Sequence, residues 1–371
     1  YHCNGQLDAA CIYINNAASL TVEDSLFITN GAPFSLSSSS SAAVRPAGTC
    51  IYADATPVTV TGCRFAGNRS SSGTDGTATY GGLIYLLNAC DGSVIRNCAF
   101  VANECVTRTA TASKAGTLGG SIVVNFAEAI REMFIESCTF AWNLSAGYSF
   151  PADVSVNKGV ANVHNCIFSG GQLGPGIAAD TGRYFKIGSS GSLNIDYSMF
   201  DCDLKTAIGG SGKIVIAPSC ITNANPRFVT SSPELTLRSP ENFYAAYDAG
   251  VESVAATCDV HLVSAAGYVD NDGVFHTGGN VVSPAIDAGD PADDCSLEPH
   301  PNGGFINLGA YGNTVEASRT YSVEPEIVDN LVTVTFPDDT SFPKVDFDLK
   351  AAALDYTATV KVFCGTNGFD S

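Results

Sequence analysis

The sequence of 371 residues contains no apolar run near the roughly 20 residues that a membrane-spanning helix needs. Charge is scarce at 15% of residues, and basic residues are the scarcest, with 18 Lys and Arg against 37 Asp and Glu and a net charge of −19. Without a basic stripe to neutralise phosphates, nucleic acid is excluded as an expected partner and an anionic membrane surface is disfavoured. The chain begins at Tyr1 with neither Met nor a signal peptide, so we expect a mature product or an excised piece.

Helical periodicity is absent too, and a repeat stands in its place. Six copies of one phrase align on a phenylalanine: VEDSLFITN (22–30), VTGCRFAGN (60–68), IRNCAFVAN (95–103), IESCTFAWN (135–143), VHNCIFSGG (163–171) and IDYSMFDCD (195–203). The phenylalanines are 28 to 40 residues apart. Such a period indicates a solenoid, in which each unit buries its apolar face only by stacking on its neighbours.

Each unit is made of short strands. A Val or Ile opens the phrase, and Asp, Gly, Asn or Ser follows two residues later, at 24, 62, 97, 137 and 165. These residue types tolerate a left-handed backbone, so we predict a bend there. Cys or Ser and then Phe alternate inward on the next strand, and another apolar run precedes each phrase. The pattern predicts an all-β fold, a right-handed parallel β-helix with the six phenylalanines in one internal column.

The segments GGLI (81–84) and GGSI (119–122), alternating with FITN, FAGN, FVAN and FAWN, resemble the GGxI and FxxN repeats of polymorphic outer-membrane proteins. The likeness covers about residues 9–203. It implies a surface-exposed right-handed β-helix, often an adhesive passenger. Four FxxN copies in register favour the fold more strongly than they favour a function.

A second resemblance lies further along the chain. DVHLVSAAG (259–267), SPAIDAGDPADD (283–294) and EPHPNGGFINLGAYGNTVEAS (298–318) are similar to the closing module of large secreted bacterial β-helix proteins. The resemblance implies a terminator of the helix, and the glycines and prolines suit turns lying across the last rung. We therefore expect one domain at 1–318, with regular coils to about 203, irregular coils at 204–258 and the closing module at 259–318.

Residues 319–371 change in composition and alternate like exposed-face strands. About 50 residues are too few for the seven strands of an immunoglobulin-like sandwich. A partial sandwich, a strand hairpin packed on the helix and strands donated to a neighbour all remain open. At the other end, coil sequence starts at Cys11 without a covering helix, so either upstream coils are missing or another subunit stacks head to tail.

The 14 cysteines suggest two interpretations. Cys63, Cys98, Cys138 and Cys166 share one repeat position, and Cβ atoms in register on parallel coils lie about 4.8 Å apart, beyond the reach of a relaxed disulfide. We predict stacked buried thiols there. Disulfides are more plausible outside the columns, as in Cys90 with Cys105, Cys202 with Cys220 or Cys258 with Cys295. No CxxC or His/Cys spacing predicts zinc.

Within the closing module, Asp287, Asp290, Asp293 and Asp294 form the densest acidic cluster. Calcium takes six to eight oxygen ligands, and this acidic chain has few cations of its own, so a calcium site is one interpretation. The other is that Asp287 and Asp290 cap turns by accepting backbone N–H groups. Beyond calcium, no cofactor is expected.

Many parallel β-helices are polysaccharide lyases or hydrolases, so catalytic groups deserve a search. The best candidates are Glu128, Arg131 and Glu136, with Lys158 one coil on. A lyase needs a basic residue and a cation against the substrate carboxylate, and a hydrolase needs two opposed carboxylates. Carboxylates outnumber bases here, and the net charge would repel an anionic polymer. His164 shares its repeat position with Arg96, Glu136 and Asp196, which predicts a solvent-facing residue.

Tyr13, Tyr52 and Tyr85 fall in one column, with Ile12, Ile51 and Ile84 on the opposite face. If the isoleucines fill the interior, the tyrosines face outward, where they could contact sugars or stabilise the sheet by stacking. Loops of variable length at 35–45, 69–80 and 106–119 recur at one phase and are further candidates for ligand contact. We expect an extracellular or surface-displayed bacterial scaffold, structural or adhesive, that contacts glycans or a neighbouring cell surface or assembles end to end. A carbohydrate-active enzyme is the alternative.

Overall fold

The computed structural model describes residues 11–31, 49–72, 82–107, 119–146, 151–174, 180–231 and 257–320, together with four short strands between 326 and 350. The chain divides into two compact units, Tyr1–Thr320 and Tyr321–Ser371. The sequence-based boundary follows Ser318. The variable loops and the first ten residues fall largely or wholly outside the described residues, so the predictions made for them stay predictions.

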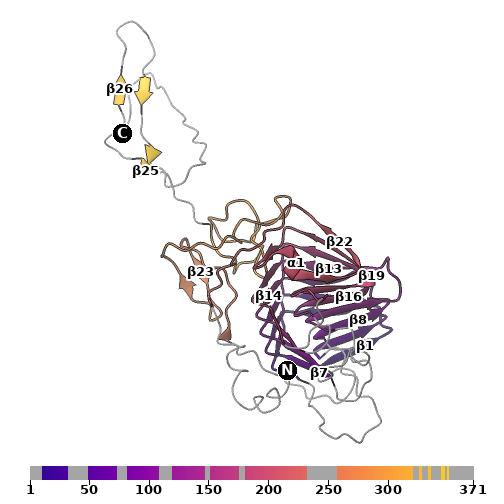
Figure 1. Ribbon diagram of the computed structural model, residues 1–371. Helices are drawn as coiled ribbons and strands as arrows, with labels where there is room; N and C mark the ends of the chain where they lie inside the picture. The colour runs from indigo at the N-terminus through magenta and orange to yellow at the C-terminus, as the bar shows by residue number, and fades with distance from the viewer. Residues whose placement is uncertain are drawn as a thin grey trace, which may run out of the picture. The chain divides into compact units, whose positions relative to one another are not determined.

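The first unit is a parallel β-helix, in which successive coils stack as rungs (Figure 1). Strands of successive coils pair with one another in parallel ladders, although within the described residues the first and last coils lack a strand in the fourth ladder. The first ladder runs through β1 (Ile12–Asn15), β4 (Ile51–Asp54), β8 (Ile84–Asn88), β12 (Ile122–Phe126), the first parts of β16 (Val154–His164) and β19 (Phe185–Asp196), and β21 (Ile208–Gly210). The second comprises β2 (Leu20–Glu23), β5 (Val58–Thr61), β9 (Ser93–Arg96), β13 (Glu132–Glu136), the second parts of β16 and β19, and β22 (Lys213–Ile216).

Two further parallel ladders contain the remaining strands of the coils. The third ladder holds the FxxN strands β3 (Leu26–Ile28), β6 (Arg64–Ala66), β10 (Ala99–Val101), β14 (Thr139–Ala141), β17 (Ile167–Ser169) and β20 (Met199–Phe200). The fourth holds β7 (Arg69–Ser72), β11 (Glu104–Thr107), β15 (Leu144–Ala146) and β18 (Gln172–Leu173). The short helix α1 (Leu204–Ala207) leads into the last rung. No helix among the described residues has the length and hydropathy to cross a membrane.

The phenylalanine column predicted from the repeat is confirmed. Phe27, Phe65, Phe100, Phe140, Phe168 and Phe200 stack inside the tube with ring centroids 4.7 to 5.2 Å apart and interplanar angles of 9° or less. That separation is the strand spacing of a sheet, because each ring belongs to the rung next to its neighbour's. The column lies in the main hydrophobic core.

The bend that opens each FxxN strand is also confirmed. Asp24, Gly62, Asn97, Ser137 and Asn165 all have positive φ, between 46° and 63°. This left-handed backbone turns the chain from the second ladder into the third. The double glycine of GGSI has a separate cause: a Cβ on Gly120 would lie 2.7 Å from the carbonyl oxygen of Asp153, so neighbouring rungs approach there too closely for a side chain.

The asparagine that ends each FxxN strand builds a buried asparagine ladder, which comprises Asn30, Asn68, Asn103 and Asn143. In the three steps of the ladder, the backbone N–H and side-chain amide of Asn30, Asn68 and Asn103 donate to Oδ1 of the next asparagine, at 2.9 and 3.0 Å. The amides of Asn68, Asn103 and Asn143 also donate to the carbonyl oxygen of a phenylalanine in the preceding coil. The ladder thus satisfies backbone groups at a bend where the sheet hydrogen bonds stop.

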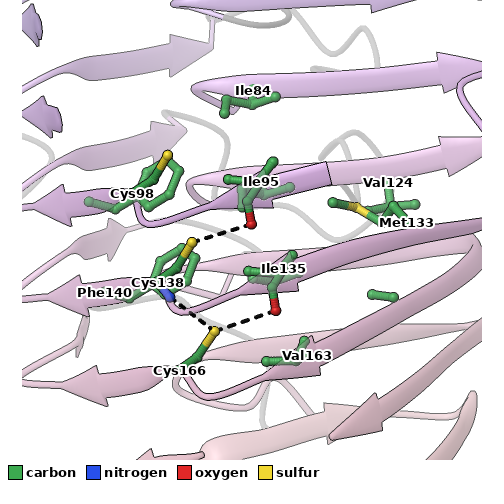
Figure 2. Packing of buried hydrophobic residues seen from close by; sticks show 14 of the residues in the cluster. Ile84, Ile95, Cys98, Val124, Met133, Ile135, Cys138, Phe140, Val163 and Cys166 are labelled. Atoms are coloured by element: carbon green, nitrogen blue, oxygen red, sulfur yellow. Dashed lines mark hydrogen bonds between the residues drawn. The ribbon is translucent and has the colours of Figure 1, made fainter. Parts of the chain in front are cut away.

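The cysteine column consists of buried thiols, as predicted. Figure 2 shows Cys98, Cys138 and Cys166 one above the other, with the sulfur of Cys138 hydrogen-bonded to the carbonyl oxygen of Ile95. Burial, together with the thiols of Cys166 and Cys98, raises the pKa of Cys138 well above its ordinary value. These side chains therefore act as small apolar fillers with a weak S–H donor.

The disulfides suggested outside the columns are wrong. Cys90, Cys105, Cys202, Cys220, Cys258 and Cys295 are all thiols in the structure. Cys90 instead directs its Sγ at the carbonyl oxygen of Leu87, 3.0 Å away. Cys105 is buried, and its burial raises the pKa of the thiol to about 11. Spacing along the chain gave no information on which sulfurs meet, since pairing depends on Cβ geometry.

The closing module does not lie across the last rung, contrary to expectation. It runs along the outer face of the third ladder, where Ala66, Val101, Ala141, Ile167 and Met199 pack against Val260, Leu262, Ile286, Leu308 and Ala310. Asn97 donates to the carbonyl oxygens of Ala310 and Gly312, and Ala310 N–H donates to Thr139 Oγ1. The module contains one small antiparallel pair, β23 (Tyr268–Val269) with β24 (Phe275–His276). It therefore covers the flank of several coils.

The described strands of the second unit form two antiparallel pairs. β25 (Glu326–Ile327) pairs with β28 (Leu349–Lys350), and β26 (Thr333–Thr335) pairs with β27 (Lys344–Asp346). The β26–β27 pair is nested in sequence within the β25–β28 pair, and the partial sandwich and the hairpin packed on the helix both stay predictions. Strand donation to a neighbour stays a prediction.

Candidate functional site

A column of charged side chains ends the strands of the second ladder. Arg96, Glu136, His164 and Asp196 stand in register on β9, β13, β16 and β19. They alternate in sign where His164 is protonated. Arg96 donates two hydrogen bonds to Glu136 Oε2, one from Nε and one from Nη2. The distance from Nε to Oε2 is 2.7 Å. The column lies next to the left-handed bend, so its side chains project at the border of the flank that the closing module covers.

His164 joins the coils to the closing module. Its Nδ1 lies 2.7 Å from Asp196 Oδ1 on the next coil, and its Nε2 lies 2.8 Å from Asp293 Oδ2 in the module. Asp290 Oδ2 is 3.9 Å from the same nitrogen. A neutral imidazole has only one N–H, so both contacts are hydrogen bonds only in the imidazolium form. Although partial burial lowers it, the contacts with Asp196 and Asp293 raise the pKa of His164 overall.

Asn165, the next residue, fixes the module through three contacts. Its Nδ2 donates to Asp293 Oδ2 at 2.6 Å, its Oδ1 accepts from Asp290 N–H, and its carbonyl oxygen accepts from Gly309 N–H. The positive φ of Asn165 aims both the side chain and the carbonyl outward. His164 was predicted to face solvent, and that prediction is wrong because the module folds back over the strand end; the side chain is 25% exposed.

A hollow lies along this junction, and we name it the seam groove. Its volume is about 270 Å³. One wall comes from the charged column and its bend, and the other from turns of the closing module. It is lined by Arg96, Asn97, Glu136, Ser137, His164, Asp293, Asp294, Ile306, Gly312 and Asn313.

The candidate catalytic residues are not brought together. Glu136 lines the seam groove, whereas Glu128 and Arg131 lie in the turn that precedes β13 and do not line it. Those two pair with each other at 3.5 Å, and the Lys158 amine donates to the carbonyl oxygen of Ala127 in the same turn. Glu128 and Arg131 neutralise each other before the start of β13, whereas Glu136 lies at its end. They therefore place no second carboxylate or base beside Glu136.

The four aspartates proposed as calcium ligands each make a different set of hydrogen bonds. Asp290 Oδ1 accepts from Ala292 N–H, and Asp294 accepts from the backbone and hydroxyl of Ser296, so both cap turns. Asp293 holds His164 and Asn165, and Asp287 accepts from Thr320 Oγ1 at 2.9 Å. Across the described residues no three His, Cys, Asp or Glu side chains converge as a metal ion requires. The turn-capping interpretation therefore accounts for Asp290 but not for Asp287.

Two acids inside the closing module have perturbed protonation. Burial raises the pKa of Asp287 to about 6. Burial also raises the pKa of Glu298 to about 7, even though Glu298 Oε1 accepts from the N–H groups of Asn307 and Asn313. Glu298 is 2% exposed and its Oε2 lies buried with no partner among the described residues. These carboxyls position the turns on which the groove-lining Asn313 sits.

The tyrosine column faces outward, as predicted from the isoleucines on the opposite face. Tyr13 and Tyr52 stack at 5.2 Å with an angle of 3°, and Tyr52 and Tyr85 stack at 5.6 Å with an angle of 11°. The expected exposure is confirmed for Tyr13, which is 56% exposed, and is wrong for Tyr85, which is 2% exposed and packs against Val123. Because the rings stack along the helix axis, the faces of the middle ring are covered by its neighbours. The column therefore stabilises the sheet, and a sugar would find only ring edges along most of it.

The sequence pointed to half of the seam groove. The shared repeat position of Arg96, Glu136 and His164 was visible, but the opposing wall was not. One signal was available: the outward position directly after the phenylalanine is apolar in all four FxxN copies, at Ile28, Ala66, Val101 and Ala141. An apolar outer face implies a cover. Comparisons of the chain with protein-family models, with curated proteins and with solved structures find no match.

Proposed function

We propose that this chain is an extracellular or surface-displayed structural and adhesive scaffold. One observation carries the proposal: polar side chains on the outside of the coils are paired with the equivalent position of the next coil. The pairs are Arg69 with Glu104, Arg96 with Glu136, His164 with Asp196, and Asn162 with Asn194; at a bulge, Asn125 bonds to Asn157, the neighbour of its register partner Lys158. An outer surface whose polar groups bind one another holds coils in register and leaves few of them for chemistry.

The internal columns support the same role. Phenylalanine, asparagine and cysteine columns run through consecutive coils without interruption by a functional residue. Such a tube is stiff, because each rung is fixed by hydrogen bonds to two neighbours. Rigidity and a surface of low charge density suit a protein that presents contacts to glycans or to a neighbouring cell. Assembly through the first rung or through donated strands belongs to the proposal as its means of forming longer structures.

A polysaccharide lyase or glycoside hydrolase is the second candidate, and the seam groove is the observation that favours it. The groove collects Arg96, Glu136, His164 and Asp293. Against it, Arg96 is neutralised by Glu136, and Asp293 Oδ2 already accepts from His164 and Asn165. A lyase needs a free basic side chain beside its substrate, and both basic side chains of the lining, Arg96 and His164, already contact carboxylates. The scaffold is therefore the better account.

The test is incubation of the full chain with neutral and uronate polysaccharides. Ultraviolet absorbance would reveal unsaturated lyase products, and a reducing-end assay would reveal hydrolysis. We expect neither signal, with retention of the chain on at least one immobilised glycan or on intact cells. Turnover of any polymer that disappears in Glu136→Gln would support the enzyme instead. Absence of both turnover and retention would leave only end-to-end assembly, which electron microscopy of the full chain would show as filaments.

A further inference from the structure

The seam groove presents polar atoms that the protein itself does not use. Arg96 reaches Glu136 through Nε and Nη2, and both donors end on the single oxygen Oε2. Asp293 likewise accepts from His164 and Asn165 on Oδ2 alone. Within the described residues no hydrogen bond reaches Arg96 Nη1, Glu136 Oε1 or Asp293 Oδ1. Three residues that line the groove thus each keep a polar atom without a hydrogen bond to the described part of the chain, a donor on Arg96 and an acceptor on Glu136 and on Asp293.

We propose that the seam groove is a binding site for one uncharged sugar residue, held through adjacent hydroxyl groups by Arg96, Glu136 and Asp293. A hydroxyl both donates and accepts, so a pair of neighbouring hydroxyls can accept from a guanidinium and donate to two carboxylates. The inference rests on the proposed function, because it names the ligand class of an adhesive contact.

Size and shape set the scale of the ligand. The groove measures about 270 Å³, slightly less than the roughly 300 to 1,000 Å³ of sites for drug-sized molecules. It therefore accommodates one ring of a longer chain. Ile306 and Gly312 supply apolar surface between the polar groups, which the C–H face of a pyranose can cover. The walls are fixed before binding, because Asn97 and Asn165 tie the module to the coils.

Charge selects a neutral ligand. The basic side chains of the lining are Arg96 and His164, and the acidic ones are Glu136, Asp293 and Asp294. An anionic sugar would meet three carboxylates in a chain of net charge −19. A cationic ligand would have to compete with Arg96 and His164 for carboxylates that they already hold. A neutral polyol adds hydrogen bonds without disturbing either pair.

The experiment is calorimetric titration of the full chain with methyl glycosides of glucose, galactose, mannose and N-acetylglucosamine. Galacturonate and methylamine serve as anionic and cationic probes. We expect saturable binding of at least one neutral glycoside, weakened about tenfold in Glu136→Gln, the equivalent of one charge-assisted hydrogen bond. Glu23→Gln is the matched control: Glu23 occupies the same strand position three coils away, is exposed, and does not line the groove.

Three results would overturn the site: no neutral glycoside saturates, the two Gln variants bind alike, or a charged probe binds more tightly than every neutral one. Should Glu136→Gln fold poorly, hydrogen exchange of the unmodified chain gives the answer, because bound sugar should slow exchange near residues 96–97 and 312–313. Retention on polysaccharide that persists when groove binding fails would leave the adhesive function intact and remove only this site.

Discussion

Asn143 donates a 2.7 Å hydrogen bond from its side-chain amide to Oδ1 of Asp153, and the buried asparagine ladder ends at this contact. The following coil carries Gly171 in place of an asparagine, so no further amide is available to continue the series. Asp153 is 1% exposed and its Oδ2 is buried without a partner among the described residues. The ladder is therefore closed by a buried carboxyl group, and its burial raises the pKa of Asp153 well above the ordinary value.

The first prediction concerns the middle of this ladder. In Asn103→Ala, the N–H and amide of Asn68 lose their acceptor and the carbonyl oxygen of Phe65 loses its donor, all in the interior. Unsatisfied buried groups cost about 1 to 3 kcal/mol each. We expect unfolding free energy to fall by about 2 to 4 kcal/mol, measured by urea denaturation. Asn15→Ala, at an exposed position of β1, should change stability by less than about 0.5 kcal/mol; equal effects of the two would show that the ladder is not structural.

The second prediction concerns the acid at its end. Burial raises the pKa of Asp153 well above its ordinary value. An acid with a raised pKa in the folded state contributes stability that is complete below its unfolded pKa and is lost as pH rises toward the folded value. Asp153→Asn keeps the Oδ1 acceptor and cannot ionise, so its urea midpoint should exceed that of the unmodified chain at pH 7. The difference should be smallest near pH 3, and the control Asn15→Ala, which replaces no ionisable group, should show no such trend.

The fold could be predicted because the repeat constrains every coil independently. Phe27 and Phe200 are far apart in sequence, yet alternation on each short strand points both rings inward, and stacking does the rest. Left-handed residues such as Asn97 could be predicted as well, since few residue types tolerate that backbone. Loops of different length did not disturb the inference, because insertions between strands leave the register of the rungs unchanged.

Placement of the closing module could not be predicted in the same way. Its contacts with the coils join residues as distant as Asn97 and Gly312, and no periodicity relates the two. His164 is an example. Its repeat position predicted an exposed side chain, but the closing module lies beside it and brings Asp293 into contact with it. Disulfide pairing failed for a similar reason, since Cys90 and Cys105 are close in sequence, but Cys90 lies in the turn between β8 and β9 and Cys105 lies in β11 of the fourth ladder.

The third prediction tests the close approach of rungs at the GGSI segment. A Cβ on Gly120 would lie 2.7 Å from the backbone oxygen of Asp153, and its φ of 111° suits glycine alone. Gly92 is the matched control, with a φ of 75° and open space around the added atom. Gly120→Ala should destabilise the chain more than Gly92→Ala, by at least about 1 kcal/mol in urea denaturation, because it adds overlap to backbone strain. Equal losses would mean that strain alone decides.

The last prediction concerns the pH dependence of the contacts by which His164 links the coils to the closing module. The histidine faces Asp196 from the next coil, Asp293 and Asp290 from the module, and Glu136 from the preceding coil. Its pKa is raised in the folded chain. A histidine whose pKa is raised by folding stabilises the folded state fully below its unfolded pKa, near 6.5. This stabilisation is lost as pH rises through the folded pKa. Docking of the closing module should therefore weaken at alkaline pH.

Hydrogen exchange at the N–H groups of Gly309 and Ala310 measures that docking, because they bond to Asn165 and Thr139 on the coils. After correction for intrinsic rates, their protection should fall between pH 6 and pH 9 in the unmodified chain and change little in His164→Gln. The double variant that combines His164→Gln with Asp293→Asn should lose less protection than the two single variants lose together. Each single substitution already removes the contact between His164 and Asp293. His276→Gln, whose imidazole pairs with Asp270 inside the module, is the control. An unchanged pH slope in His164→Gln would assign the docking to the apolar contacts alone, because the histidine would then add nothing that titrates.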